Sequence, residues 1–400
     1  MKPLFRLILG TLTLAAPSVY AGEIGKVNVT GFVGIESRVF LQDGRFDGQS
    51  SDTQNSIIIS PEFRYKTEDR RHQFAFLPFF RLDGEDNERT HADIREAYWL
   101  WRGDEFEILT GVNKVFWGVA ESRHLVNIIN QTDAVEDLDG EDYLGQPMIN
   151  LSTQRDWGQV DFFVLPGFRE RTFAGKNGRF RGPLTVDDKN PNYESGAEEH
   201  HIDFAARYSH YFGEWDVGLS HFYGTGREPR LLLNAAGTEL EPYYDLINQT
   251  GVDLQYTGDA WLWKLESIVR SGQGDRFIAA VGGFEYTFYQ ILEKDWDLGI
   301  LSEYQYDNRD ASAPITTQDR DIFAGFRLAL NDIQDSELLA GVSIDTKTGE
   351  KFFSLEAERR IGDNYDIELR ARFFTGADRN EKTYPLEQDD YLQIRFSRYF

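Results

Sequence analysis

The alternation of apolar and polar residues is clearest in FSLEAERRI at residues 353–361 and in YDIELRARF at residues 365–373. Successive side chains of a β-strand point to opposite faces, so a period of two predicts strands with one apolar and one polar face. The polar parity of both stretches is strongly charged: it carries Ser354, Glu356, Glu358 and Arg360 in the first, and Asp366, Glu368, Arg370 and Arg372 in the second.

Only residues 362–364 separate these two strands, which predicts a tight hairpin. If Ile361 lies opposite Tyr365, then Arg360 faces Asp366 and Glu356 faces Arg370 on the polar face. Directly opposite side chains interact most strongly in an antiparallel pair, so we expect an ion pair at both positions.

The same pattern recurs along the chain in about eighteen segments. They are residues 26–41, 54–66, 71–82, 91–101, 104–112, 149–156, 158–165, 202–212, 215–225, 250–257, 260–270, 276–288, 295–306, 319–330, 335–345, 352–361, 364–375 and 389–400. Every second connection is a short turn, and the others include long segments at 42–53, 113–148, 166–201, 226–249, 307–318 and 376–388. This alternation predicts an all-β, antiparallel up-and-down transmembrane β-barrel with both termini on the periplasmic side. Sixteen strands remain an alternative if 149–156 and 158–165 leave the wall.

The composition agrees with a membrane barrel. The chain has 30 Phe, 19 Tyr and 8 Trp, yet its mean hydropathy is −0.49, because half of each barrel strand faces a polar interior. The absence of cysteine excludes disulfides and Cys-ligated zinc. A net charge of −25 argues against nucleic acid as a partner and suits loops that face lipopolysaccharide and divalent cations.

The two ends of the sequence carry export and assembly signals. Residues 1–21 combine Lys2 and Arg6 with a short apolar run and end in Ala21, which predicts a cleaved secretory signal peptide followed by a barrel over residues 22–400. The last segment ends in Phe400, and barrel-assembly machinery reads such a terminal aromatic residue. We therefore expect the outer membrane of a Gram-negative bacterium as the location, with its lipid, its lipopolysaccharide and the assembly machinery as partners.

Three short motifs resemble a known group of proteins: REAY at residues 95–98, GVNKVFWG at 111–118 and NIINQTD at 127–133. Together they resemble a group of uncharacterised proteobacterial outer-membrane β-barrels, and they are more distantly similar to alginate-export-type and porin-like barrels. In that wider group a strand, Trp-Gly, a short helix and Asn-x-x-Asp follow one another. The resemblance covers residues 90–170 and implies the fold and the location, but no particular substrate.

The segment 119–131 has apolar residues at helical rather than strand spacing, so we expect a short helix within the long loop. An apolar helix needs a burial site, and the barrel mouth offers one; the loop would then narrow the pore, and the alternative is a lid over the rim. The candidate residues of this constriction are Trp117, Glu121, Arg123, Asn127, Asn130 and Asp133.

Other possible sites are weaker. Asp137, Asp139 and Glu141 alternate as calcium ligands do, but the rest of a calcium loop is missing, so a solvated acidic loop is the favoured interpretation. We expect no metal and no cofactor. The pairs Ser209-His210 and Ser220-His221 are adjacent on strands and face opposite sides, so we expect no enzyme.

The polar parity predicts the residues that line the lumen. They are Glu62, Arg64, Arg207, Asp253, Glu266, Arg270, Glu285, Glu303, Arg327, Glu356, Glu358, Glu368, Arg370, Arg372 and Arg395. These charges can pair and stiffen the wall, and they can create a field across a narrow pore; the two roles are compatible.

The resulting hypothesis is a porin-like channel for passive diffusion of small polar or anionic-to-neutral solutes, narrowed by an inward-folded loop. One alternative is a conduit for lipid or other hydrophobic molecules that works with an inner-membrane exporter. Another is a loop-based adhesin or receptor with a plugged lumen.

Overall fold

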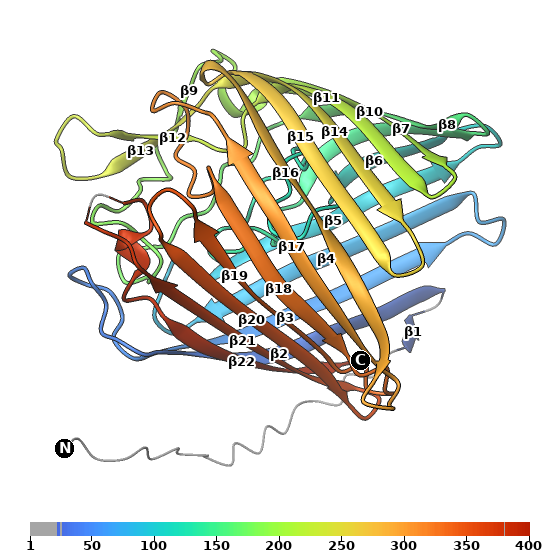
Figure 1. The fold of residues 1–400 in the computed structure, drawn as a ribbon. Coiled ribbons are helices and arrows are strands. Elements are labelled where there is room, and N and C mark those ends of the chain that lie inside the picture. Colours follow the sequence, from blue (N-terminus) through green and yellow to red (C-terminus); the bar gives the residue numbers. More distant parts are fainter. Residues whose placement is uncertain (1–21, 25, 380) are drawn as a thin grey trace.

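The computed structural model describes residues 22–24, 26–379 and 381–400, and in this part of the chain eighteen antiparallel strands close into a barrel (Figure 1). The expected signal peptide, residues 1–21, lies outside the described residues. Closure is made by β22 and β2, which pair from Phe32–Tyr399 to Phe40–Tyr391.

The barrel strands follow one another in the order of the sequence. They are β2 (Val27–Phe40), β3 (Thr53–Lys66), β4 (His72–Asp83), β5 (His91–Arg102), β6 (Glu107–Asn113), β7 (Gln146–Arg155), β8 (Gly158–Pro166), β10 (Ile202–Phe212), β11 (Trp215–Thr225), β14 (Leu246–Thr257), β15 (Trp261–Gly272), β16 (Gly274–Ile291), β17 (Trp296–Asp307), β18 (Asp321–Ala329), β19 (Glu337–Asp345), β20 (Lys351–Ile361), β21 (Tyr365–Thr375) and β22 (Tyr391–Tyr399). The prediction of eighteen strands is confirmed. Because β7 and β8 are part of the wall, the sixteen-stranded alternative is wrong.

Six minor elements lie outside this order. A short strand β1 (Gly22–Ile24) pairs with β2, and the long loops contain β9 (Asn192–Tyr193), β12 (Arg230–Leu233) and β13 (Leu240–Tyr244), which form a separate small sheet. Two single 3-10 turns, η1 (Glu198–His200) and η2 (Tyr384–Leu386), are the helical elements of the described residues. No helix in the described ranges is long and apolar enough to cross a membrane.

The hairpin of β20 and β21 has the predicted register, with Ile361 opposite Tyr365 and Glu356 opposite Arg370. The two predicted ion pairs are wrong. Glu356 pairs with Arg372, two residues along the strand, while Arg370 reaches Asp137 of a loop inside the barrel at 2.6 Å. The long side chain of arginine can thus pair with a carboxylate that is not directly opposite it on the neighbouring strand.

The two faces of the wall differ as the alternation requires. Outward residues at mid-strand are apolar and exposed, as with Ile59, Phe204, Leu265 and Ile394. Exposed aromatic side chains gather near the short turns, among them Trp99, Trp157, Tyr211, Trp215, Trp261, Phe288 and Tyr365. Such a surface is stable against hydrocarbon, with the aromatic belt at its boundary with water.

The connections separate the barrel into a long-loop end and a short-turn end (Figure 1). The strands are joined at the long-loop end by residues 114–145, 167–201, 226–245, 308–320 and 376–390. One connection at that end is tight: Gln273 alone joins β15 to β16, flanked by Gly272 at φ 105° and Gly274 at φ 74°. Both angles lie in the region that glycine adopts readily, which permits the reversal.

Candidate functional site

Residues 114–145, here called the lumen loop, fold into the barrel and divide its interior. The first part of the loop packs against the inner faces of β6 to β16. Val126 and Ile129 are completely buried there. The apolar cluster joins loop and wall side chains: Trp117, Ala120, Leu125, Val126, Ile128 and Ile129 from the loop, with Leu109, Met148, Phe163, Leu165, Phe222, Ile247, Ile268, Phe277 and Val281 from the strands. Burial of this much apolar surface fastens the loop and excludes water from this side.

The predicted helix over 119–131 is wrong, because wall carboxylates bind the backbone amides that a helix would use. Glu266 of β15 is fully buried and accepts hydrogen bonds from the backbone N–H groups of Val119 at 2.7 Å and Ala120 at 2.9 Å. Its second oxygen accepts the amide of Val126 at 3.1 Å. Bonds from amides to a carboxylate are stronger than neutral ones, so the segment is more stable as an irregular nest.

Glu303 of β17 binds the next turn of the loop in the same way. Its carboxylate accepts the backbone N–H groups of Glu121 and Ser122, both at 2.8 Å, and the Ser122 hydroxyl at 2.6 Å. Two wall glutamates therefore hold five loop amides. The alternation placed both glutamates in the lumen, but nothing in the sequence indicated that their partners would be backbone groups.

The second part of the lumen loop is fastened by arginines of the opposite wall. Arg81 of β4 donates to Glu136 at 2.5 Å and to Glu36 of β2 at 3.0 Å, and all three side chains are buried. Arg38 of β2 donates to the backbone carbonyl of Glu136 at 2.5 Å. Arg89 binds the same Glu36 at 2.6 Å. Ion pairs of this kind hold their partners in place because an unpaired buried charge is very costly.

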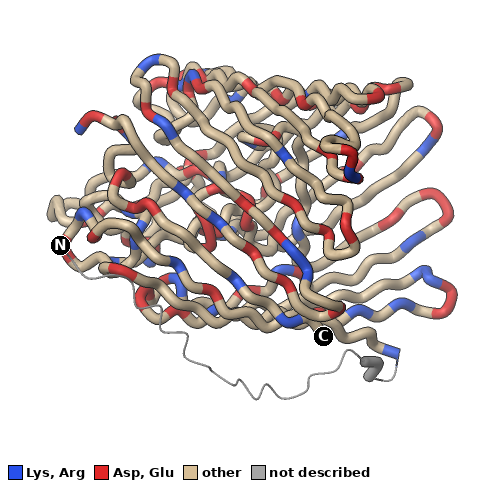
Figure 2. The backbone as a smooth tube through the Cα atoms, turned by 60° about the horizontal axis from the view of Figure 1, so that its bottom comes forward, with Lys and Arg blue, Asp and Glu red and all other residues tan. Residues whose placement is uncertain are grey.

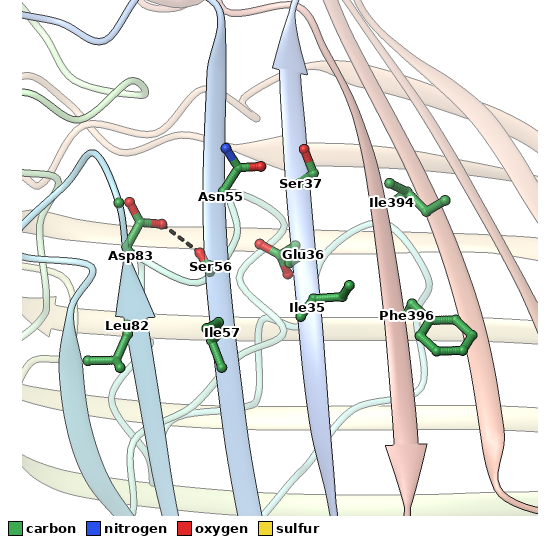
Figure 3. A pocket seen from close by; sticks show the side chains of 11 residues that line it. Ile35, Glu36, Ser37, Asn55, Ser56, Ile57, Leu82, Asp83, Ile394 and Phe396 are labelled. Carbon is green, nitrogen blue, oxygen red and sulfur yellow. Dashed lines mark hydrogen bonds between the residues drawn. The ribbon is translucent and has the colours of Figure 1, made fainter. Parts of the chain in front are cut away.

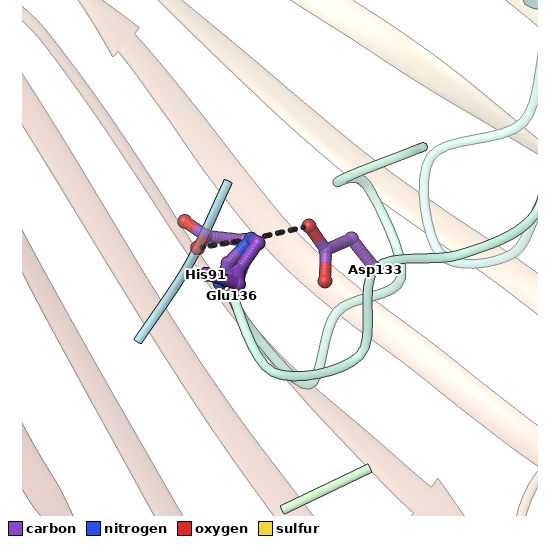
Figure 4. Close-up of side chains that lie close together, drawn as sticks. All are labelled: His91, Asp133 and Glu136. Atoms are coloured by element: carbon purple, nitrogen blue, oxygen red, sulfur yellow. Dashed lines mark hydrogen bonds and ion pairs between the residues drawn. The ribbon is translucent and has the colours of Figure 1, made fainter. Parts of the chain in front are cut away.

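Figure 4 shows His91 of β5 between the loop carboxylates Asp133 and Glu136, at 3.1 and 3.6 Å. These three residues have ligand atoms close enough to hold a metal ion. However, Arg95 also binds Asp133 at 2.6 Å and Arg81 binds Glu136, so both carboxylates already have cationic partners. Burial opposes ionisation of Asp133, but His91 and Arg95 hold its pKa below the ordinary value. The cluster therefore fits a fastening role and does not fit a metal site.

The weak calcium candidates Asp137, Asp139 and Glu141 do not converge on a common centre. Asp137 and Asp139 face Arg370 and Arg372 of β21, and Glu141 pairs with His124 at 2.7 Å. The expected solvated acidic loop is therefore wrong for Asp137, which is buried against arginines.

Three loop groups have strongly shifted pKa values. Burial, reinforced by Asp137, raises the pKa of Asp139 to about 7. Burial together with Glu136 raises the pKa of Asp142 to about 6. Although burial disfavours its charge, Glu141 and Glu266 raise the pKa of His124 to about 10, so His124 is a cation at neutral pH. Asp139 and Asp142 are thus loop carboxyls whose charge changes near neutrality, and of the two only Asp139 lines the passage.

Other loops partly cover the long-loop end, and Arg179 of loop 167–201 holds them together. It binds Asp389 at 2.6 Å and donates to the carbonyls of Ser51 at 2.9 Å and Gln42 at 3.1 Å. Three loops therefore meet at one buried guanidinium.

A passage remains between the lumen loop and strands β17 to β21. It consists of three cavities of about 120, 270 and 240 Å³ in order from the long-loop end to the short-turn end. The first two share the lining residues Leu138, Gln318, Ser343 and Phe352, and the second and third share Glu121, Leu339 and Glu356. Neighbouring cavities therefore adjoin one another, and the three form a row beside the loop.

A fourth cavity, of about 540 Å³, lies under the apolar cluster on the opposite side, between the loop and β7 to β14. Trp117 and Arg207 line it, and none of its lining residues belongs to the three cavities of the passage. Its lining includes Asp156 and Gly158 beside the short turn of β7 and β8, and Gly118 and Val119 of the lumen loop.

The candidate constriction residues have different positions. Glu121 lines the passage, while Trp117 lines the fourth cavity and packs on Phe163. Arg123 binds Asp307 of β17 at 2.9 Å. The remaining candidates Asn127, Asn130 and Asp133 bond within the loop or to the wall and line no part of the passage. Sequence reasoning missed Leu138, Gln305, Gln318 and Ser343, which lie on the route.

The predicted lumen charges occupy the strand positions opposite in parity to the exposed apolar residues. Acidic and basic positions are interspersed along the backbone (Figure 2). Many are paired across strands or to the loop, as with Arg207 and Asp253 at 2.7 Å, Arg270 and Glu228 at 2.9 Å, and Arg64 and Glu96 at 3.3 Å. Arg395 pairs with Glu368, Glu62 with Arg64, and Glu285 lies 3.7 Å from Arg327.

The outer wall carries a depression of about 520 Å³ over β2, β3, β4 and β22 (Figure 3). Ile35, Ile57, Leu82, Ile394 and Phe396 line it, with the polar Ser37 and Asn55 among them. The strands around it are continuously paired, so the depression does not open into the lumen.

No protein-family model matches the sequence, and no curated protein matches it either. The fold is similar to that of many solved structures, among them three outer-membrane proteins. Wzi of Escherichia coli, a carbohydrate-binding outer-membrane β-barrel involved in group 1 capsule assembly, matches with a TM-score of 0.53 at 8% identity over 92% of this chain and 84% of its own. A BenF-like porin from Pseudomonas fluorescens Pf-5 matches with a TM-score of 0.54 at 8% identity, over 94% of this chain and 97% of its own. OccK11 (OpdR) of Pseudomonas aeruginosa matches with a TM-score of 0.51 at 9% identity, over 94% of this chain and 95% of its own. At such low identity these similarities show a shared fold, that of outer-membrane β-barrels including porins.

Proposed function

We propose that this chain is an outer-membrane channel for the passive diffusion of small polar solutes, narrowed by the lumen loop. The observation that carries the proposal is the row of three adjoining cavities between the loop and β17 to β21. Charged side chains line its whole length, and only a water-filled interior tolerates such a lining cheaply. An eighteen-stranded barrel is also too wide for its own side chains to fill.

The same observations weigh against a conduit for lipid. Such a conduit needs an apolar tunnel or a gap in the wall, whereas the eighteen strands are paired around the whole barrel. The apolar depression lies outside the wall, and the inner route is lined by carboxylates and guanidinium groups. A polar solute therefore fits the interior better than a lipid chain does.

A second candidate is a binding barrel with a closed lumen that acts through its outer loops. The buried Arg179 contacts and the small sheet of β9, β12 and β13 favour it, because they give the long-loop end a fixed surface. The absence of ionic current in a bilayer would support this candidate over the channel.

The absence of cysteine allows a direct test of the route by single cysteine substitutions. Ser343 lines both the first and the second cavity of the passage. Purified Ser343→Cys protein in a planar bilayer should lose most of its current when a small charged methanethiosulfonate reagent attaches to the thiol, because the adduct lies where the first and second cavities adjoin.

Ser220→Cys is the matched control, since Ser220 is also an inward serine but is buried on the side where the loop packs. Its current should not change with the reagent. Equal block of both variants would place the route elsewhere in the lumen, and a protein without any current is not a channel.

A further inference from the structure

We propose that the passage selects cations, so that its solutes are small cations and uncharged polar molecules. This inference rests on the proposed channel function and adds the sign of the charge that it prefers. It replaces the expectation of anionic-to-neutral solutes that the mixed lumen charges suggested.

The short-turn end of the passage carries a row of three adjacent carboxylates. Glu337, Glu358 and Glu368 lie directly opposite one another on β19, β20 and β21, and all three line the third cavity. Glu368 pairs with Arg395. Among the described residues, no cation lies within ion-pair distance of Glu337 or Glu358.

The long-loop end repeats the arrangement. Asp321 and Asp345 lie directly opposite each other on β18 and β19, both are buried, and both line the first cavity. Asp319 joins them, with carboxylate oxygens of all three within 4.8 Å. In the described chain, Lys382 approaches Asp319 at 3.7 Å, and neither Asp321 nor Asp345 has an ion-pair partner.

Like charges directly opposite in a sheet are destabilising. Elsewhere in the lumen an arginine offsets this cost at individual carboxylates, as Arg207 does at Asp253. The two unpaired clusters both lie on the passage, one at each end. Mobile cations in the passage would compensate the negative charge of these two clusters. At Asp253 the side chain of Arg207 has this role.

The middle of the passage contains polar side-chain atoms that have no hydrogen-bond partner within the described protein and can therefore bind a solute. Gln305 of β17 is fully buried, lines the second cavity, and neither polar atom of its side chain has a partner among the described residues. The Ser343 hydroxyl and the Arg372 Nε are also unpartnered there. A buried amide needs a hydrogen-bond partner, and hydrated ions or polar solutes in the cavity supply one.

The balance of charge differs between the two sides of the loop. Ten carboxylates line the three cavities of the passage, against four Lys and Arg side chains and His124. The fourth cavity has three carboxylates against two arginines. A narrow passage with an excess of negative charge concentrates cations and repels anions.

The test is the reversal potential of the purified protein in a planar bilayer under a KCl gradient. At 0.1 M salt we expect potassium to be favoured over chloride by about fivefold or more. In the double variant Glu337→Gln/Glu358→Gln this ratio should fall by about threefold, since two unpaired charges are lost and no arginine is left without a partner.

Asp216→Asn is the matched control, because Asp216 lines the fourth cavity and its loss should leave the ratio unchanged. At 1 M salt the screening length is about 3 Å, so the selectivity of the unmodified protein should also fall. Current with a ratio of one or below, or an equal fall in the Asp216→Asn variant, overturns the inference alone. No current overturns the channel function and the inference together.

Discussion

The two sides of the lumen loop are fastened by different forces, and only one side leaves a route. On the side of β6 to β16, Val126 and Ile129 are fully buried in an apolar cluster with the wall. On the other side the contacts are ion pairs, such as Asp137 with Arg370 and Arg372. Apolar packing covers an area and removes water, whereas ion pairs fix separate points and tolerate wet space between them. The passage follows the charged side for this reason.

The largest effect is expected from Glu266→Ala. This substitution leaves the amides of Val119, Ala120 and Val126 without their acceptor in a dry site. At about 1–3 kcal/mol for each of the three buried unsatisfied donors, the free energy of unfolding should fall by about 3–9 kcal/mol. A denaturant titration of the refolded barrel measures this, and single-channel conductance should rise as segment 119–126 leaves the wall.

Glu285→Ala is its control, because Glu285 also faces the lumen but accepts no amide of the described loop. Its effect on stability should stay within about 1 kcal/mol. If the two variants were equally unstable, the loop would not depend on the Glu266 contacts.

A pair of apolar truncations in the same loop compares the two sides directly. Ile129→Ala creates a cavity in the apolar cluster and should cost about 3 kcal/mol with conductance unchanged. Leu138→Ala removes a side chain from the wall of the passage and should cost about 1 kcal/mol while raising conductance. Urea titration and single-channel recording separate these outcomes, and the reverse pattern would mean that ions pass on the apolar side.

The smallest expected effect is a dependence of selectivity on pH. Burial and Asp137 raise the pKa of Asp139, which lines the second cavity, to about 7. Asp139 is therefore neutral at pH 5 and charged at pH 8, so the preference for potassium should increase over this interval. The reversal potential measured at several pH values tests this.

In the Asp139→Asn variant the preference for potassium should no longer change around pH 7. Asp142 does not line the passage, so the Asp142→Asn variant should keep the pH dependence of the unmodified protein. A step that survives in Asp139→Asn would assign the titration to another group.

The sequence predicted most of the barrel, because a strand between lipid and water needs an apolar residue at every second position whatever lies elsewhere. The register of Ile361 and Tyr365 followed from the short turn alone. The ion pairs of that hairpin did not follow, since Arg370 found its carboxylate on Asp137, which is 233 residues away in the sequence.

In the lumen loop the spacing of apolar residues along the sequence did not predict the secondary structure. The apolar residues of 119–131 correctly indicated burial, and their spacing suggested a helix. The structure forms none, because Glu266 and Glu303 bind the amides that the helix would need. An apolar segment buried in a wall that also presents carboxylates has two ways to satisfy its backbone, and only the tertiary arrangement decides between them.

By itself, then, the sequence determined the period of two, the number of strands and the polar inner face, all of which depend on neighbours in the chain. The tertiary structure alone decided which lumen charges are paired and which, like Glu337 and Glu358, are left unpaired along a passage. That choice depends on where the lumen loop lies across the barrel, and hence on contacts between residues that are far apart in the sequence.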